Sequence, residues 1–151
     1  MDLFSVMRSF SAEDTEAIGK KIAEAILNDK ALPRFIALYG DLGVGKTAFT
    51  RGFTSAIAPT ARVKSPTFAL VNQYKGDSIS VFHFDMYRIT DSDDLYSIGY
   101  DDYVEREGYC IVEWSENIED MLPEGAITVS ISRTESETVR RIEVEYDNLS
   151  L

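Results

Sequence analysis

Helical and extended hydrophobic patterns follow one another along the first part of the chain. Ser11, a residue type that caps helix N-termini, precedes apolar residues at helical spacing: Ile18, Ile22, Ala25 and Ile26. The continuous apolar run 35–39 ends at Gly40 and is typical of a buried strand. Beyond a glycine-rich turn, helical spacing returns and stops before Pro59, with Phe49, Phe53, Ala56 and Ile57 as its apolar positions. The pattern therefore predicts a helix, a buried strand and a second helix.

The rest of the pattern is mostly that of strands. Segments 68–74 and 79–85 are joined by a short polar link, which predicts an antiparallel hairpin. Segment 109–113, which is mainly apolar, predicts another buried strand. Apolar and polar residues alternate in 127–131 and again in 142–146, which predicts two half-buried strands that pair antiparallel. Together the elements predict a three-layer α/β fold with a mixed, partly antiparallel sheet.

Composition agrees with a globular protein. The chain has 151 residues, of which 44% are hydrophobic and 27% charged, so we expect a single domain over residues 1–151. Cys110 is the one cysteine, which leaves no internal disulfide, and we expect an inert thiol on a strand. No apolar run approaches the ~20 residues of a membrane span. The N-terminus also lacks the pattern of a signal peptide. We expect a cytoplasmic protein that does not contact a membrane.

Charge is distributed unevenly. Between Asp91 and Glu124 there are twelve acidic residues and a single basic one, Arg106. This segment alone therefore accounts for the net charge of −11. Within this range the pattern predicts one or two short acidic helices over 91–107 and a further short helix that is capped by Ser115 and stops at Pro123. The charged residues of segment 42–76 are all basic: Lys46, Arg51, Arg62, Lys64 and Lys75. The acidic total disfavours direct binding to nucleic acid, whereas the basic segment either holds phosphates or a partner, or is a solvated face.

The glycine-rich turn matches the phosphate-binding pattern G-x-x-x-x-G-K-[ST], called the P-loop or Walker A motif, at every position. Its residues are Gly40, Asp41, Leu42, Gly43, Val44, Gly45, Lys46 and Thr47. The glycines allow successive backbone N–H groups to face phosphate oxygens, and the following helix N-terminus favours negative charge. Lys46 supplies a cation to the phosphates, and the Thr47 hydroxyl is a ligand type for Mg²⁺. The alternative, an ordinary glycine turn, is disfavoured by the buried strand before it and the helix after it.

Two carboxylates follow apolar strands and are candidates for the magnesium site. Asp85 ends the segment 81–84, and Glu113 ends the segment 110–112. Strands parallel to the P-loop strand would bring their carboxyl ends to the same crevice. Whether Asp85 contacts the metal directly or through water stays open, and each acid alone could be a solvated strand end. No N-K-x-D guanine motif is present, which favours ATP over GTP.

Four segments in this order resemble the TsaE family, formerly YjeE, of small bacterial P-loop ATPases. They are GDLGVGKT at 40–47, KSPTF at 64–68, HFDMYR at 83–88 and EWS at 113–115. The resemblance implies a role in making threonylcarbamoyladenosine, the tRNA modification next to the anticodon. It also implies that the protein acts with a TsaB–TsaD heterodimer and contacts tRNA only through that complex. ATP hydrolysis would then reset the complex between cycles.

The resemblance assigns roles to individual residues. Thr47 and Glu113 match the family's Mg²⁺ ligands, and Lys46 and Asp85 are the catalytic candidates. Asp85 matches the acid of the family's His-x-Asp-x-Tyr-Arg motif, which either orients water or acts on the metal indirectly. Ser65 and Thr67 match a switch-like segment, although a plain strand entry explains them too. Many members have a hydroxyl residue where this chain has Ala48, so a contact to the α-phosphate is expected to be missing.

Further matched or neighbouring residues have open alternatives. Ser11 and Thr15 match a segment that reaches the nucleoside, but helix capping explains them equally well. Trp114 either contacts a partner or packs. His83 is either a packed strand residue or a functional one. Arg88 either pairs with Asp85 or meets phosphate or a partner.

A basic stretch and two other functional classes complete the sequence-based hypotheses. The basic stretch that contains Arg51, Arg62 and Lys64 is a candidate for part of a docking face. A small-molecule kinase is an alternative function, but the acidic segment lacks the several arginines of a kinase lid. A nucleotide-gated binding module, in which hydrolysis is incidental, is the other alternative.

Overall fold

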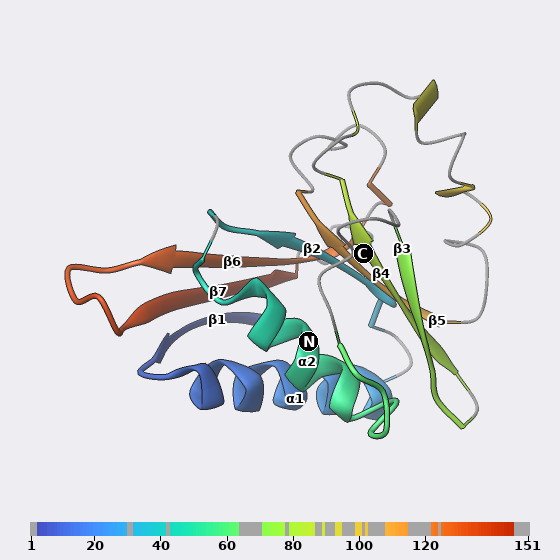
Figure 1. Cartoon of the computed structure of the whole chain (residues 1–151). Coiled ribbons are helices and arrows are strands. Elements are labelled where there is room, and N and C mark those ends of the chain that lie inside the picture. Colours follow the sequence, from blue (N-terminus) through green and yellow to red (C-terminus); the bar gives the residue numbers. More distant parts are fainter. Residues whose placement is uncertain are drawn as a thin grey trace.

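A computed structural model, shown in Figure 1, describes most of the regular structure of the chain. The described residues are 3–29, 32–41, 43–63, 71–77, 79–86, 89, 93–94, 99–100, 102, 108–114, 122–123 and 125–146, with side chains from residue 6 onward. The elements are β1 (Leu3–Ser9), α1 (Ala12–Asn28), β2 (Phe35–Tyr39), α2 (Lys46–Ser55), β3 (Val71–Lys75), β4 (Ser80–Asp85), β5 (Gly108–Glu113), β6 (Ile127–Arg133) and β7 (Arg140–Tyr146).

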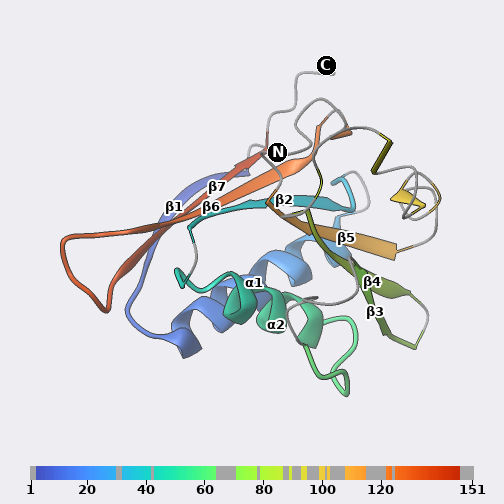
Figure 2. The same ribbon diagram turned by 45° about the horizontal axis from the view of Figure 1, so that its top comes forward.

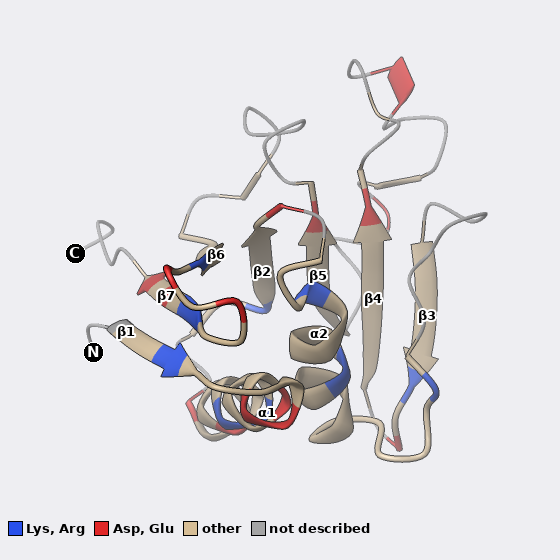
Figure 3. Ribbon diagram, turned by 60° about the vertical axis from the view of Figure 1, so that its left-hand side comes forward, with Lys and Arg blue, Asp and Glu red and all other residues tan. Residues whose placement is uncertain are grey.

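Within the described part of the chain, one seven-stranded sheet has the order β1-β7-β6-β2-β5-β4-β3. The central strands β6, β2, β5 and β4 are parallel to one another, whereas β3 pairs antiparallel with β4 at one edge, and β7 pairs antiparallel with β6 and β1 at the other. Figure 3 shows β2, β5 and β4 pointing the same way and β3 pointing back. The predicted mixed α/β fold is therefore confirmed, including the β3–β4 hairpin and the β6–β7 pair.

β1 is a strand that the hydrophobic pattern did not predict. It pairs antiparallel with β7 over its whole length, from Leu3 opposite Tyr146 to Ser9 opposite Arg140. As an edge strand it is only partly covered, and Val6 leaves 47% of its surface exposed. Such a strand needs little hydrophobic alternation, because backbone pairing with its neighbour specifies it.

Both described helices cover the same face of the sheet (Figures 1 and 2). Ser11 caps α1 as predicted: its Oγ accepts the N–H of Asp14 at 3.1 Å, and the Asp14 carboxylate accepts the N–H of Phe10 at 2.9 Å. The helices cross closely because glycines face backbone at the crossing. A Cβ on Gly19 would lie 2.3 Å from the carbonyl oxygen of Phe49, and one on Gly52 would lie 1.9 Å from that of Glu16. The glycines thus hold α2, which starts at the P-loop, against α1.

Each face of the sheet has its own hydrophobic cluster. Between the sheet and the helices, Phe49 and Phe53 of α2 pack on apolar strand residues that include Ile36, Leu38 and Ile111. On the opposite face, Phe84 and Tyr100 pack edge to face, with ring centroids 5.7 Å apart. The acidic helices predicted for 91–107 and the helix predicted after Ser115 lie largely outside the described residues. None of the helices in the described part is long and apolar enough to span a bilayer.

Candidate nucleotide-binding site

The glycine-rich motif joins the end of β2 to the start of α2, the arrangement that phosphate binding requires. Gly40, Gly43 and Gly45 have φ values of +153°, +78° and +112°, which L side chains rarely adopt. A Cβ on Gly40 would also lie 2.7 Å from the carbonyl oxygen of Ile131. Gly45 is the N-cap of α2 and brings no side chain to it. The loop therefore presents backbone and a helix N-terminus to a ligand.

Lys46 of this loop lies against Trp114. Its side chain is largely buried, and Nζ lies 4.7 Å from the centroid of the Trp114 ring. Trp114 follows β5 directly with a φ of +59°, unusual for a bulky residue. This turn places the indole ring beside Lys46, so the cation is held over an aromatic face at the candidate site.

The two candidate carboxylates end neighbouring strands. β5 lies between β2 and β4, and its parallel register sets Glu113 beside Leu38 of β2 on one side and Asp85 of β4 on the other. The backbone N–H of Met86 donates to the carbonyl of Glu113 at 3.0 Å, which extends the pairing past the strand ends. Figure 3 shows acidic residues at these two strand ends, at the same edge of the sheet as the P-loop. Thr47, the second residue of α2, is half-buried.

Glu113 is a buried acid held by a histidine. It is 5% exposed, and its Oε2 lies 2.6 Å from Nε2 of His83, which is fully buried. Tyr74 of β3 follows, with its hydroxyl 3.5 Å from Nδ1 of His83. Sequence reasoning listed His83 as undecided between packing and function, and its contact with Glu113 arises only when β4 and β5 pair.

These residues are suited to Mg²⁺ by their chemistry. Thr47, Asp85 and Glu113 offer hard oxygen ligands, and Mg²⁺ sites commonly use one or two carboxylates together with substrate phosphates and water. Among the described residues, no cluster of three or more His, Cys, Asp or Glu side chains gathers as an all-protein metal cage. By their chemistry, the oxygen ligands of Thr47, Asp85 and Glu113 fit a metal that also binds a phosphate ligand.

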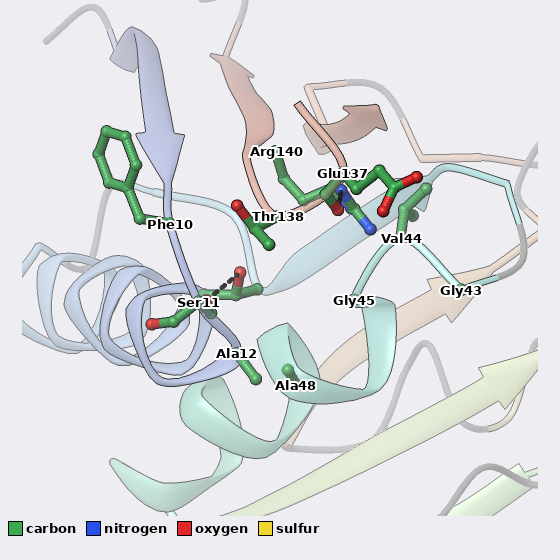
Figure 4. A pocket seen from close by; sticks show the side chains of 11 residues that line it. Phe10, Ser11, Ala12, Gly43, Val44, Gly45, Ala48, Glu137, Thr138 and Arg140 are labelled. Atoms are coloured by element: carbon green, nitrogen blue, oxygen red, sulfur yellow. Dashed lines mark hydrogen bonds between the residues drawn. The ribbon is translucent and has the colours of Figure 1, made fainter. Parts of the chain in front are cut away.

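A pocket of about 310 Å³ adjoins the P-loop on the side of β1 and α1 (Figure 4). Ser11 and Thr15, expected near the nucleoside, both line it. The Thr15 hydroxyl is buried and lies 2.6 Å from Oγ of Ser9, so it also fixes the start of α1. The lining consists of Phe10, Ser11, Ala12, Thr15, Gly43, Val44, Gly45, Ala48, Glu137, Thr138 and Arg140.

One wall of this pocket was missed by sequence reasoning. Glu137 and Thr138 belong to the β6–β7 connection, and Arg140 starts β7. Arg133 at the end of β6 also reaches the loop, because a Cβ on Gly43 would lie 3.2 Å from its Nη2. The alternating pattern predicts the hairpin, but no local signal shows that it leans toward the P-loop.

The remaining candidates lie elsewhere or are not described. Leu42, Lys64, Ser65, Thr67 and Arg88 fall outside the described residues. The exposed Arg62 lines a second, open hollow of about 550 Å³ with Ala61, Asn72, Gln73, Tyr74 and Lys75.

Cys110 points away from the site, into the cluster on the opposite face of the sheet. Burial raises the pKa of its thiol to about 12, so the thiol stays protonated and unreactive at neutral pH.

Comparison with known proteins identifies the family. The family model of the threonylcarbamoyl adenosine biosynthesis protein TsaE matches residues 9–142. The chain is 40% identical to the tRNA threonylcarbamoyladenosine biosynthesis protein TsaE of Haemophilus influenzae, over 86% of this chain and 77% of that protein. It is 39% identical to the Bacillus subtilis protein of the same name, over 83% and 76% of the two chains.

A solved structure supports the same assignment. The crystal structure of Bacillus subtilis YdiB aligns with a TM-score of 0.76 and 30% identity, and the alignment covers 99% of this chain and 90% of that one. The sequence match extends from the end of β1 into β7, so it includes the P-loop and both strand-end carboxylates. The chain therefore belongs to the TsaE family of threonylcarbamoyl adenosine biosynthesis proteins.

Proposed function

We propose that this protein binds and hydrolyses ATP with Mg²⁺ in support of threonylcarbamoyladenosine modification of tRNA next to the anticodon. The observation that carries the proposal is the P-loop between β2 and α2 with the buried Glu113 at the end of the adjacent parallel strand. A phosphate cradle and a carboxylate at one sheet edge are the two parts that P-loop nucleotide hydrolysis needs.

In this proposal the loop and helix bind the phosphates. Backbone N–H groups of 40–47 and the N-terminus of α2 face phosphate oxygens, and Lys46 adds a point charge. Thr47 and Glu113 would hold Mg²⁺, with Asp85 a direct ligand or one that acts through water. When bound, the metal offsets negative charge on the phosphates during transfer. Trp114 would restrict the motion of Lys46 through their contact.

Asp85 is the candidate for orienting the attacking water. It ends β4 beside Glu113 and is partly exposed, so a water molecule can reach its carboxylate. Holding that water in line with the terminal phosphate contributes mainly by positioning. The nucleoside would occupy the pocket between the N-terminus of α1 and the β6–β7 hairpin, near Ser11 and Thr15.

The tRNA pathway and the partner rest on family membership. The relatives from H. influenzae and B. subtilis are named tRNA threonylcarbamoyladenosine biosynthesis proteins. We extend that role to this chain, with a TsaB–TsaD heterodimer as partner, tRNA engaged through the complex, and the cytoplasm as the compartment. Hydrolysis by the isolated protein is expected to be slow, because the sequence has no recognised arginine-finger motif and its acidic segment 91–124 supplies only Arg106.

Calorimetric titration of Lys46→Ala with a non-hydrolysable ATP analogue and Mg²⁺ tests the nucleotide site. Loss of a charge-assisted contact of about 1.5–3 kcal/mol predicts binding weaker by about 10- to 100-fold. Arg51→Ala is the matched control, because it removes an exposed cation from the same helix. Wild-type affinity in a folded Lys46→Ala protein would refute the site. Reconstituted tRNA modification under multiple-turnover conditions, with and without the protein, tests the pathway role.

A further inference from the structure

His83 is a fully buried polar residue next to the proposed magnesium ligand. It is the only histidine in the chain and lies within β4, between Phe82 and Phe84. Those two phenylalanines pack on the opposite face of the sheet, whereas His83 faces the side of Glu113. A purely packed position at this depth would favour an apolar residue, since burying an imidazole without partners is costly.

The contacts of His83 have a consistent direction. An ionised Glu113 only accepts hydrogen bonds, so Nε2 of His83 carries the proton in the 2.6 Å contact. In the tautomer whose proton is on Nε2, Nδ1 accepts, which makes the Tyr74 hydroxyl the donor in the 3.5 Å contact. Asn72 Nδ2 in turn donates to the Tyr74 oxygen at 3.4 Å. These contacts therefore form a hydrogen-bond series that runs from Asn72 through Tyr74 and His83 to the Glu113 carboxylate.

We propose that His83 is a positioning residue that fixes the orientation of the Glu113 carboxylate for Mg²⁺ binding. Its Nε2–H engages Oε2 and so leaves the other carboxylate oxygen to the metal or to a metal-bound water. The inference rests on the proposed function, because it concerns the same site. Partners that orient a ligand in this way typically change metal affinity by about 10- to 100-fold when removed.

Two substitutions at His83 separate orientation from packing. His83→Gln keeps an N–H donor close to the position of Nε2, whereas His83→Leu keeps bulk and removes the donor. We expect His83→Leu to raise the Mg²⁺ concentration needed for half-maximal binding of a non-hydrolysable ATP analogue by about 10-fold or more. His83→Gln should stay within about 3-fold of wild type, because the donor alone accounts for the effect. Affinity for the analogue in EDTA should be the same in all three proteins, since Glu113 then has no metal to hold.

Tyr74→Phe is the matched control for the outer end of the series. It removes one hydroxyl and keeps the ring, so the contact between His83 and Glu113 remains. Its Mg²⁺ requirement should change less than that of His83→Leu. Equal Mg²⁺ requirements in wild type and His83→Leu would overturn the positioning role, as would equal losses in the leucine and glutamine variants. Absence of any Mg²⁺-dependent binding by wild type would instead overturn the proposed function itself.

A spectroscopic readout applies to the unmodified protein. With ¹⁵N-labelled histidine, the single ring gives one set of signals, so its tautomer is read without further assignment. We expect a proton on Nε2 and a shift of this signal when Mg²⁺ and the ATP analogue are added together, but not with the analogue in EDTA. A ring protonated only on Nδ1 would overturn the inference, because Nε2 then has nothing to donate to Glu113.

Discussion

Gly52→Ala should destabilise the protein by forcing α1 and α2 apart. The added Cβ would lie 1.9 Å from the Glu16 carbonyl oxygen and 2.6 Å from its carbon, where real contacts essentially never fall below 3.0 Å. The helices must therefore separate by about 1 Å, and the obstacle is backbone that has no rotamer to change. Phe49 and Phe53, which are fully buried next to this crossing, would lose contacts as a result.

The expected magnitude follows from two opposing effects. Overpacking a well-packed interior costs about 1–3 kcal/mol, and a backbone clash lies at the upper end. Alanine in place of glycine within a helix returns at most about 1 kcal/mol. The net loss in the free energy of unfolding is then about 2 kcal/mol, which corresponds to a melting temperature lower by about 4–8 °C for a chain of this size.

Urea denaturation followed by circular dichroism measures this loss, and Arg51→Ala is its control. Arg51 neighbours Gly52 and pairs with the side chain of Glu16 at 2.6 Å, but both side chains are substantially exposed. Exposed pairs of this kind contribute about 0–1 kcal/mol, so Arg51→Ala should be nearly neutral. If Gly52→Ala is as stable as Arg51→Ala, the close crossing of α1 and α2 is wrong.

Three further outcomes are expected. Glu113→Gln should keep the fold, because the amide oxygen still accepts from His83, but weaken the Mg²⁺ dependence of analogue binding by about 10-fold or more on titration; an unchanged dependence would pass the ligand role to Asp85. Burial raises the pKa of the Cys110 thiol to about 12. The contribution of the buried, protonated thiol to the free energy of unfolding is therefore complete below about pH 9 and declines as pH rises toward about 12, because the thiol of the unfolded chain ionises first. The free energy of unfolding, measured by urea denaturation across that pH range, should therefore fall more steeply for wild type than for Cys110→Ala. Parallel pH curves for the two proteins would contradict the effect of burial. We expect a TsaB–TsaD partner to stimulate hydrolysis. Charge reversal by Arg62→Glu with Lys64→Glu should reduce this stimulation but leave nucleotide affinity nearly unchanged in calorimetry; full stimulation of the variant would reject this docking face.

The sequence by itself determined the glycine-rich motif of the candidate nucleotide site. The motif 40–47 is contiguous, and the glycines that need positive φ, the cation and the hydroxyl follow one another along the chain. The strand before it and the helix after it are equally local, because hydrophobic periodicity over a few residues reports burial on one or both faces. Asp85 and Glu113 could also be anticipated, since the ends of apolar strands in an α/β fold meet at one edge.

Only the tertiary structure decided which distant residues meet at this site. The pairing of β4 with β5 brings His83 to Glu113, and the turn after β5 brings Trp114 to Lys46. The edge strand β1 and the pocket wall from Glu137 to Arg140 depend on long-range pairing with β7 rather than on a local pattern. Gly52 likewise shows no local requirement for glycine, because the requirement comes from its close contact with the backbone of α1, which lies far earlier in the chain. Side-chain periodicity encodes which face of an element is buried, but it does not encode the neighbour that buries it.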